Sequence, residues 1–351
     1  MCVSPIKIKN PCRNPKLDSG ITSRYTDTES LYIRVACGVC HECLSLKASQ
    51  IIQRISAHCM ENYAFMLTLT YKPDCTPRVV LDDTHILNCF DYSHFSRMVR
   101  RIRNDKLLPY PFTYCLVGEF GGKKHRPHYH ALIFFDKKYF SRNSVIAKAS
   151  LLNLQDVLYN VFKDNWSVNI GSQRKPIYLP LFEYHRRGKF CNFDLHFIDC
   201  FSDERANNAA SVYVTKYLTK SSDYVRRLKA WLFLNYPRDI AFKAWKSLKP
   251  RVIMSVNLGV NRTAAHHIDE CYTDTFESGK IIYTLPDGSK PPICKYFISK
   301  YIPKPARPKP DSLSDKSIVI PYNRTSDSIT SSINRNDNKK PFRSSVLDEF
   351  L

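Results

Sequence analysis

The 351-residue sequence contains no apolar run that approaches the roughly 20 residues needed to span a bilayer. Its first residues also lack the charged segment, the apolar core and the small-residue cleavage site of a secretory signal. Membrane-spanning and secreted classes of protein are therefore not expected. We predict that the protein stays in the compartment where it is made.

Acidic residues are few relative to basic ones. The chain has 32 Asp and Glu against 53 Lys and Arg, which gives a formal net charge of +21 and predicts a polyanionic partner. Its 21 Tyr and 20 Phe supply flat rings on which bases can stack. Hydrophobic residues make up 43% of the chain, so it can bury a core and is not wholly disordered. This composition favours a nucleic-acid-binding protein.

Cysteine is present but not in a disulfide pattern. The count of 13 is odd, and the residues are scattered with one tight cluster, which predicts reduced thiols and a cytosolic compartment. In that cluster Cys37, Cys40 and Cys43 can supply three thiolates to a structural zinc ion. The fourth ligand would be one of three residues, namely His41, Cys12 or Cys2. Alternatively, Cys43 begins a helix and the thiols bind no metal.

The pattern of apolar residues predicts an α+β fold with a central, mostly antiparallel sheet flanked by helices. The predicted helices cover about 44–62, 93–104 (capped by Asp91 or Ser93), 144–162 and 203–220, and the predicted strands cover 65–70, 113–120 and 129–135, with one or two more within 166–199. We divide the chain into an N-terminal arm (1–35), this domain (36–225), an appended region of mixed structure (226–302) and a disordered tail (303–351). No internal repeat is present.

A pair of histidines on the predicted strand 129–135 is the first candidate site. His128 and His130 project from one face because strand side chains alternate, and Glu119 ends the preceding strand. A short antiparallel hairpin can bring the carboxylate beside the two imidazoles. Such a set leaves open positions on a divalent cation, as a Lewis-acid site requires. The alternative is that the two histidines are simply half-buried.

Two tyrosines on the predicted helix 203–220 are the second candidate site. Tyr213 and Tyr217 are four residues apart and share a face, with Lys216 and Lys220 as a second such pair beside them. Either phenol can thus reach the same site, where a metal-polarised phosphate and a nearby cation would favour the deprotonated, nucleophilic form of the tyrosine. The alternative is that both rings pack in the core.

Together these motifs resemble a known family. The run 65–70, the motif 118–120 with 126–132, and the motif 213–217 resemble the three ordered motifs of HUH endonucleases, the initiators of rolling-circle replication. The resemblance covers about residues 36–220 and is closest to the replication initiators of gokushoviruses, which are circular single-stranded DNA phages of the Microviridae. It implies a palm of split-βαβ type, similar to an RNA-recognition fold.

The resemblance also implies roles for individual residues. Glu119, His128 and His130 match the metal ligands, for Mg²⁺ or Mn²⁺. Tyr213 and Tyr217 match the paired nucleophiles, and Lys216 matches the basic residue beside them. Phosphate contacts are expected from four further cations, namely Lys123, Lys124, Arg126 and Lys220.

The activity implied is a site-specific, metal-dependent nicking and joining of single strands. The enzyme would nick origin DNA of a circular phage genome, keep the 5′ end as a phosphotyrosine, leave a 3′-OH that primes synthesis, and rejoin the displaced strand into a circle. The resemblance implies action in the bacterial host cytoplasm, together with host helicase and polymerase.

Two other functions also fit the same residues. In a non-catalytic, zinc-dependent protein that binds single-stranded nucleic acid, the cysteine cluster would matter and the histidines and tyrosines would pack or stack. A relaxase or transposase would share the HUH chemistry and differ in its substrate.

Overall fold

The computed structural model describes most of the central domain and several shorter segments. The described residues are 6–9, 32–35, 38, 40–122, 124–172, 174–182, 193–201, 216, 222–273 and 293–301. No helix within these residues is both long and apolar enough to cross a membrane.

A five-stranded antiparallel sheet forms the centre of the fold, in the order β10-β3-β7-β6-β11. The strands are β3 (Asn62–Thr70), β6 (Thr113–Phe120), β7 (Pro127–Asp136), β10 (Phe193–Phe197) and β11 (Val252–Met254). The predicted α+β class and the mostly antiparallel sheet are confirmed. β3, predicted as a strand buried on both faces, lies in the interior of the sheet between β10 and β7.

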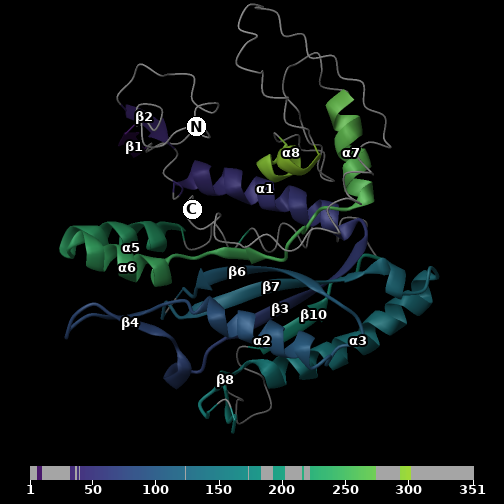
Figure 1. The fold of residues 1–351 in the computed structure, drawn as a ribbon, viewed down its shortest axis with the longest axis horizontal. Coiled ribbons are helices and arrows are strands. Elements are labelled where there is room, and N and C mark those ends of the chain that lie inside the picture. The colour runs from purple at the N-terminus through teal and green to yellow at the C-terminus, as the bar shows by residue number, and fades with distance from the viewer. Residues whose placement is uncertain are drawn as a thin grey trace, which may run out of the picture.

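Helices cover both faces of this sheet (Figure 1). α1 (His41–Cys59) lies on one face, and α2 (Tyr92–Asn104) and α3 (Ser144–Asn165) lie on the other. Both of these helices are capped at their N-terminus: Asp91, a predicted cap, accepts a hydrogen bond at Oδ1 from the Ser93 N–H at 2.9 Å, and Asn143 Oδ1 accepts from the Val145 N–H at 3.0 Å.

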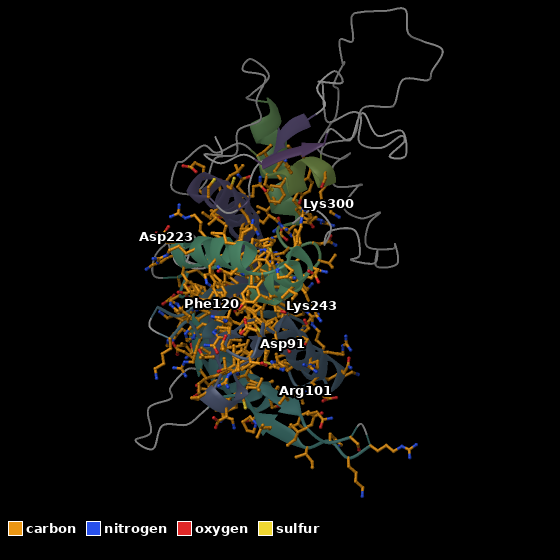
Figure 2. All side chains as sticks on the ribbon, turned by 90° about the vertical axis from the view of Figure 1, so that its left-hand side faces the viewer. Asp91, Arg101, Phe120, Asp223, Lys243 and Lys300 are labelled. Carbon is orange, nitrogen blue, oxygen red and sulfur yellow. The ribbon has the colours of Figure 1, made fainter. Side chains whose placement is uncertain are left out.

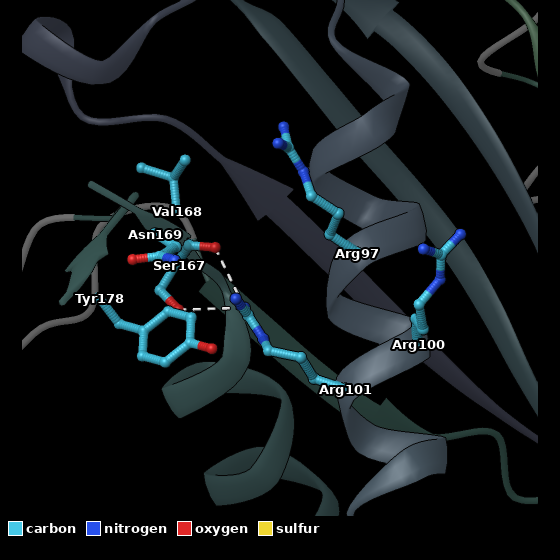
Figure 3. Close-up of a pocket in the computed structure, with 7 residues that line it drawn as sticks. All are labelled: Arg97, Arg100, Arg101, Ser167, Val168, Asn169 and Tyr178. Carbon is cyan, nitrogen blue, oxygen red and sulfur yellow. Dashed lines mark hydrogen bonds between the residues drawn. The ribbon is translucent and has the colours of Figure 1, made fainter. Parts of the chain in front are cut away.

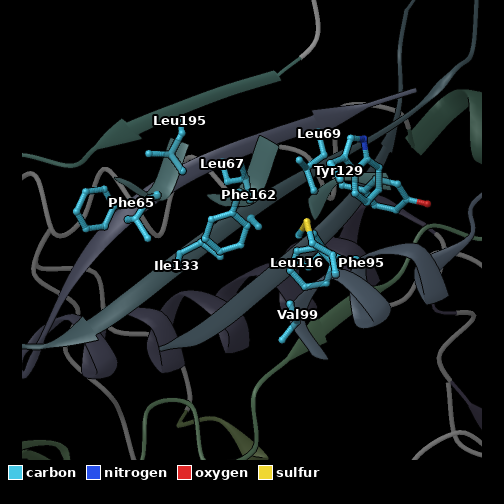
Figure 4. Close-up of a cluster of buried hydrophobic side chains, with 14 of the residues drawn as sticks. Phe65, Leu67, Leu69, Phe95, Val99, Leu116, Tyr129, Ile133, Phe162 and Leu195 are labelled. Carbon is cyan, nitrogen blue, oxygen red and sulfur yellow. The ribbon is translucent and has the colours of Figure 1, made fainter. Parts of the chain in front are cut away.

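The alternation of side chains in β7 divides the core into two parts. Tyr129 and Ile133 point toward α2 and α3 and belong to the larger cluster, in which Figure 4 shows Phe95 and Phe162 meeting the sheet. Leu132 and Phe134 point the other way and join a smaller cluster with α1. One strand therefore contributes to two cores with a period of two residues.

Three short two-stranded sheets lie outside the central one. They pair β1 (Ile6–Lys9) with β2 (Tyr32–Val35), β4 (Arg78–Val80) with β5 (Ile86–Asn88), and β8 (Ser167–Asn169) with β9 (Tyr178–Pro180). The first pair lies within the predicted N-terminal arm, where no strand was predicted. Strands of four residues are too short for their alternation to stand out in the sequence.

The region 226–302 contributes to the sheet as well as to its surroundings. Its described residues provide β11, most of α5 (Ser222–Asn235), and the helices α6 (Arg238–Leu248), α7 (Arg262–Thr273) and α8 (Lys295–Tyr301). α5 and α6 pack together through Leu232 and Trp245, whereas α7 and α8 pack against Ala57 of α1.

Two predicted features lie outside the described residues. Of the predicted helix 203–220 only Lys216 is described, and it is helical and exposed. The predicted disordered tail, 303–351, is not among the described residues either.

Candidate active site

The β6–β7 hairpin places the candidate metal ligands on one face of the sheet. Glu119 is directly opposite His128 in the antiparallel register, and Val117 is opposite His130. Directly opposed residues have Cβ atoms about 4.5–5.5 Å apart. The hairpin is closed by a hydrogen bond from Gly121 N–H to the Arg126 carbonyl at 2.9 Å. The predicted hairpin therefore brings the three side chains to the same end of the sheet, on the face covered by α1.

Glu119 and His130 are already in contact. The distance between Glu119 Oε2 and His130 Nε2 is 3.1 Å, and the two residues are only 2% and 7% exposed. A buried carboxylate needs a partner because desolvation penalises its charge. The imidazole supplies that partner, and the pair is held at the boundary of the smaller core.

Two threonines of β3 orient the two imidazoles. Thr70 Oγ1 lies 2.6 Å from His128 Nδ1, and Thr68 Oγ1 lies 3.3 Å from His130 Nδ1. The register explains both contacts, because Thr68 is opposite His130 and Thr70 is opposite His128. When Nδ1–H donates to a hydroxyl, Nε2 keeps its lone pair for a metal. Sequence reasoning missed these roles, although the Thr-x-Thr spacing matches the His-x-His spacing.

Gly121 makes room for the His128 ring. A Cβ at this position would lie 2.5 Å from His128 Nε2. The imidazole therefore packs against the backbone at the start of the hairpin loop. An alanine here would force the ring or the loop to move.

The donor set suits a divalent cation, since it combines two imidazole nitrogens with a carboxylate. In the part of the chain that the structure describes, however, no three His, Cys, Asp or Glu side chains are close enough to hold an ion as they stand. Glu119 is turned to His130, and the ring of His128 rests on Gly121. Metal binding at this site would therefore need His128 and Glu119 to turn toward one another.

Cations from three elements lie near this end of the sheet. The backbone carbonyl of Arg251 accepts a hydrogen bond from Gly118 N–H at 3.1 Å, next to Glu119. Burial lowers the pKa of Lys249 to about 8, and the nearby charges of Lys47, Arg251 and Lys229 contribute to the same shift. Like charges gathered in this way repel each other, and an anion among them would relieve that repulsion. The predicted phosphate contacts on the hairpin loop are separate from this group: Lys124 is exposed, Arg126 is half-buried and Lys123 lies outside the described residues.

An aromatic stack fixes the start of α5 to the hairpin loop. The rings of His125 and Tyr224 are parallel to within 8° with centroids 3.7 Å apart, and Tyr224 also meets Phe120 edge-on at 5.3 Å. His125 has a backbone φ of 45°, an unusual conformation for a residue other than glycine. Sequence reasoning missed Tyr224 altogether. No local pattern pairs it with His125, which lies about a hundred positions earlier in the chain.

The candidate nucleophiles are not among the described residues. Tyr213, Tyr217 and Lys220 fall within the segments 202–215 and 217–221, which the structure does not describe. Lys216 alone is described, and it is exposed. These assignments stay predictions.

The cysteine cluster is described only in part. Cys40 is the residue before α1 and has extended backbone angles, and Cys43 lies in the first turn of the helix. Cys37 is outside the described residues, and so are Cys2 and Cys12. The zinc site therefore stays a prediction too.

An ion pair on β10 also lies on the face of the candidate ligands. Asp194 is opposite Thr68, in the same cross-strand row as His130, and its Oδ2 is 2.7 Å from His196 Nε2. Both side chains are more than half exposed. Sequence reasoning did not single out this pair, which extends the polar end of the face by one strand.

Comparison with known proteins places this arrangement in a replication context. A family model that describes replication-associated proteins of the ORF2 type matches residues 64–222, a little under half of the chain. The matched segment contains most of β3 and all of β6 and β7, and with them all three candidate ligands. The match supports a replication initiator of the rolling-circle type. No curated protein and no solved structure gives a significant match.

Proposed function

We propose that this protein is a metal-dependent endonuclease that nicks and rejoins single-stranded origin DNA to start rolling-circle replication. The observation that carries the proposal is the cross-strand arrangement of Glu119, His128 and His130, with one threonine on each imidazole, inside the segment that matches the replication family. The substrate we propose is the genome of a small circular single-stranded DNA phage.

Three residues would hold the metal. Glu119 would contribute a carboxylate oxygen, and His128 and His130 would contribute Nε2, with Nδ1–H of each ring then donating to Thr70 or Thr68. A bound Mg²⁺ or Mn²⁺ supplies Lewis-acid polarisation of the scissile phosphodiester.

Tyr213 and Tyr217 are the proposed nucleophiles. The phenolic oxygen attacks phosphorus, the bond from phosphorus to the 3′ oxygen breaks, and the 3′ oxygen leaves with a proton as a hydroxyl. Lys216 would stabilise the phenolate before attack.

The second tyrosine allows a second cleavage, after which the first strand can be rejoined. With one phenol covalently loaded, the other can attack the regenerated origin, and the free 3′-OH then displaces the first tyrosine and closes the circle. Such exchange conserves the number of phosphodiester bonds and needs no nucleotide cofactor. Host helicase and polymerase would carry out unwinding and copying.

The positive charge near the site suits a polyanionic substrate. Lys249, whose pKa is lowered to about 8, lies among three other cations beside the end of β6. A DNA phosphate placed there would relieve their mutual repulsion. The net charge of +21 supports the same kind of partner.

The test is the formation of a denaturation-resistant protein–DNA adduct. The purified protein is incubated with Mn²⁺ or Mg²⁺ and single-stranded origin DNA from its own genome. We expect an adduct that requires metal and is abolished by His128→Ala or by Tyr213→Phe combined with Tyr217→Phe, whereas either tyrosine variant alone retains some adduct. Tyr139→Phe, on the short helix after β7, is the matched control and should react normally.

Two results would contradict the proposal. An adduct that persists in the double tyrosine variant would reject these nucleophiles. No adduct at all, from a folded protein that still binds DNA tightly, would favour the zinc-dependent binding protein, in which Cys37, Cys40 and Cys43 matter instead.

A further inference from the structure

A basic pocket lies on the side of the sheet away from the candidate metal ligands. It has a volume of about 190 Å³ and is lined by Arg97, Arg100, Arg101, Ser167, Val168, Asn169 and Tyr178, which we call the arginine pocket (Figure 3). α2 and the β8–β9 hairpin form its walls. Among the described residues that line it there are three guanidinium groups and no carboxylate.

The pocket and the metal ligands face opposite sides of the sheet. α2 packs through Phe95 and Val99 on the face that carries Tyr129, whereas His128 and His130 project from the other face of the same strand. Figure 2 shows Arg101 below Phe120, the residue that follows Glu119. A ligand in the arginine pocket would therefore lie on the opposite side of the sheet from the candidate metal site.

Arg101 forms part of the pocket wall, and its donors are used within the protein. Its Nη2 donates to the Asn165 carbonyl, to the Ser167 carbonyl at 3.0 Å and to Ser167 Oγ at 3.1 Å. Its guanidinium lies over the Tyr178 ring, with the carbon 4.6 Å from the ring centroid. Arg101 thereby holds the β8–β9 hairpin against α2 and occupies one face of the tyrosine.

The remaining groups stay accessible to a ligand. Tyr178 is 48% exposed, and Arg100 makes no hydrogen bond or ion pair within the described part of the chain. Arg97 donates to Ser93 Oγ at 2.7 Å and approaches Asp91 at 3.9 Å, yet its side chain is 53% exposed. Because they are three residues apart on one helix, Arg97 and Arg100 lie within one turn of each other.

The β8–β9 hairpin extends the same surface beyond the pocket. Ile170 and Ile177 are 62% and 60% exposed, and Arg174 and Lys175 are exposed at its far end. Exposed apolar and aromatic groups interleaved with cations are the composition that binds unpaired strands, since bases stack on rings while cations contact phosphates. The bases of a duplex are already stacked on each other, so an aromatic platform favours unpaired DNA.

We propose that the arginine pocket holds an unpaired stretch of DNA outside the cleavage site, with Tyr178 stacked on a base and Arg97 and Arg100 on phosphates. The choice of DNA as ligand rests on the proposed function. The inference that the pocket takes a flat ring and negatively charged groups rests only on the residues that line it. A replication initiator with this surface would keep hold of a second segment of single strand while the first is cut.

The test measures binding of the full-length protein to a fluorescent oligothymidine that lacks the origin sequence. EDTA is present, so cleavage cannot occur and the result does not depend on the nicking proposal. We expect Tyr178→Ala to weaken binding about tenfold without changing its salt dependence, and Tyr178→Phe to bind like the wild type. Arg100→Gln should weaken binding and reduce the slope of log Kobs against log salt by about 0.7.

Arg142→Gln is the matched control. It removes the same charge from an exposed residue before α3, at the opposite end of that helix from Asn165. The proposal is overturned if Tyr178→Ala and Arg100→Gln both bind like Arg142→Gln. It is also overturned if only the arginine variant weakens binding, or if duplex DNA competes as well as single strands, because either result would leave a phosphate contact without base stacking.

Discussion

The two faces of the central sheet differ in what the same strands place on them. Toward α2 and α3, β7 presents Tyr129, Ala131, Ile133 and Phe135, all fully buried in a large apolar cluster. Toward α1 it begins with His128 and His130 and becomes apolar only at Leu132. One strand thus contributes to a stabilising core and to a polar site at once, because each face receives every second side chain. The α2–α3 face is therefore apolar along β7, whereas the α1 face combines a polar site at one end with a smaller apolar core at the other.

The largest effect should come from a core substitution on the α2–α3 face. Phe95→Ala removes a fully buried ring that contacts Tyr114 and should lower the free energy of unfolding by about 3–5 kcal/mol. Urea denaturation measures the change. Phe242→Ala, at a residue 46% exposed, is the control and should cost less than about 1 kcal/mol. Equal losses would contradict the burial of Phe95 in the larger core.

The α1 face should be sensitive to acid through His58. Burial, with the nearby Arg54 charge, lowers the pKa of His58 to about 4, so the unfolded chain binds a proton that the folded one does not. The free energy of unfolding should therefore fall by about 2–3 kcal/mol as the pH drops from about 6.5 to 4. Denaturation at several pH values should show a flatter profile for His58→Gln. The control His85→Gln, at an exposed histidine, should keep the wild-type slope.

Removing the hydroxyl that orients His128 should weaken the metal site. Thr70→Val leaves His128 Nδ1 without its partner at 2.6 Å, and we expect Mn²⁺ affinity to fall about 10–100-fold. Calorimetric titration gives the affinity. Thr76→Val removes a comparable hydroxyl that donates to the Lys72 carbonyl, and it should leave Mn²⁺ binding unchanged. An equal loss in both variants would indicate general destabilisation instead.

Adjacent glycines offer a matched pair for testing the position of the His128 ring. In Gly121→Ala the new Cβ meets His128 Nε2 at 2.5 Å, whereas a Cβ at Gly122 meets no atom within 4 Å. We expect Mn²⁺ affinity to fall about tenfold in the first variant and to stay unchanged in the second. If both variants bind Mn²⁺ with the same affinity, the His128 ring can move without loss of binding, and Gly121 does not determine its position.

The smallest effect should come from the stack that joins α5 to the hairpin loop. Tyr224→Ala removes the contact with His125 and should cost about 1 kcal/mol of stability while slowing adduct formation several-fold. Tyr139→Ala, which breaks a stack with Tyr110, is the control and should affect stability only. If Tyr224→Ala forms the adduct at the wild-type rate, the contact between α5 and the hairpin loop has no role in the reaction.

Within the central domain the sequence predicted the long elements better than the short ones. The strand 113–120 and the helix starting at Ser144 follow from apolar periodicity, and the structure confirms both bounds of the strand and the start of the helix. The helices α5, α6 and α7 were not predicted individually. The β1–β2 and β4–β5 pairs were missed, because strands of three or four residues depend on their partners rather than on a local pattern.

The candidate site shows the same limit. Spacing alone predicted that His128 and His130 share a face and that a hairpin brings Glu119 to them. The roles of Thr68 and Thr70 depend on the register between β3 and β7, a long-range pairing that spacing does not specify. The stack between His125 and Tyr224 joins residues about a hundred positions apart, so no local pattern could reveal it.

Crystals soaked in Mn²⁺ and measured near the manganese absorption edge would test the assignment of the metal ligands. We expect one anomalous peak within about 2.0–2.3 Å of Glu119 and of Nε2 of both His128 and His130, with the two imidazoles still held by Thr70 and Thr68. A peak at other residues, or none while adduct formation still requires metal, would contradict the assignment of this face as the active site.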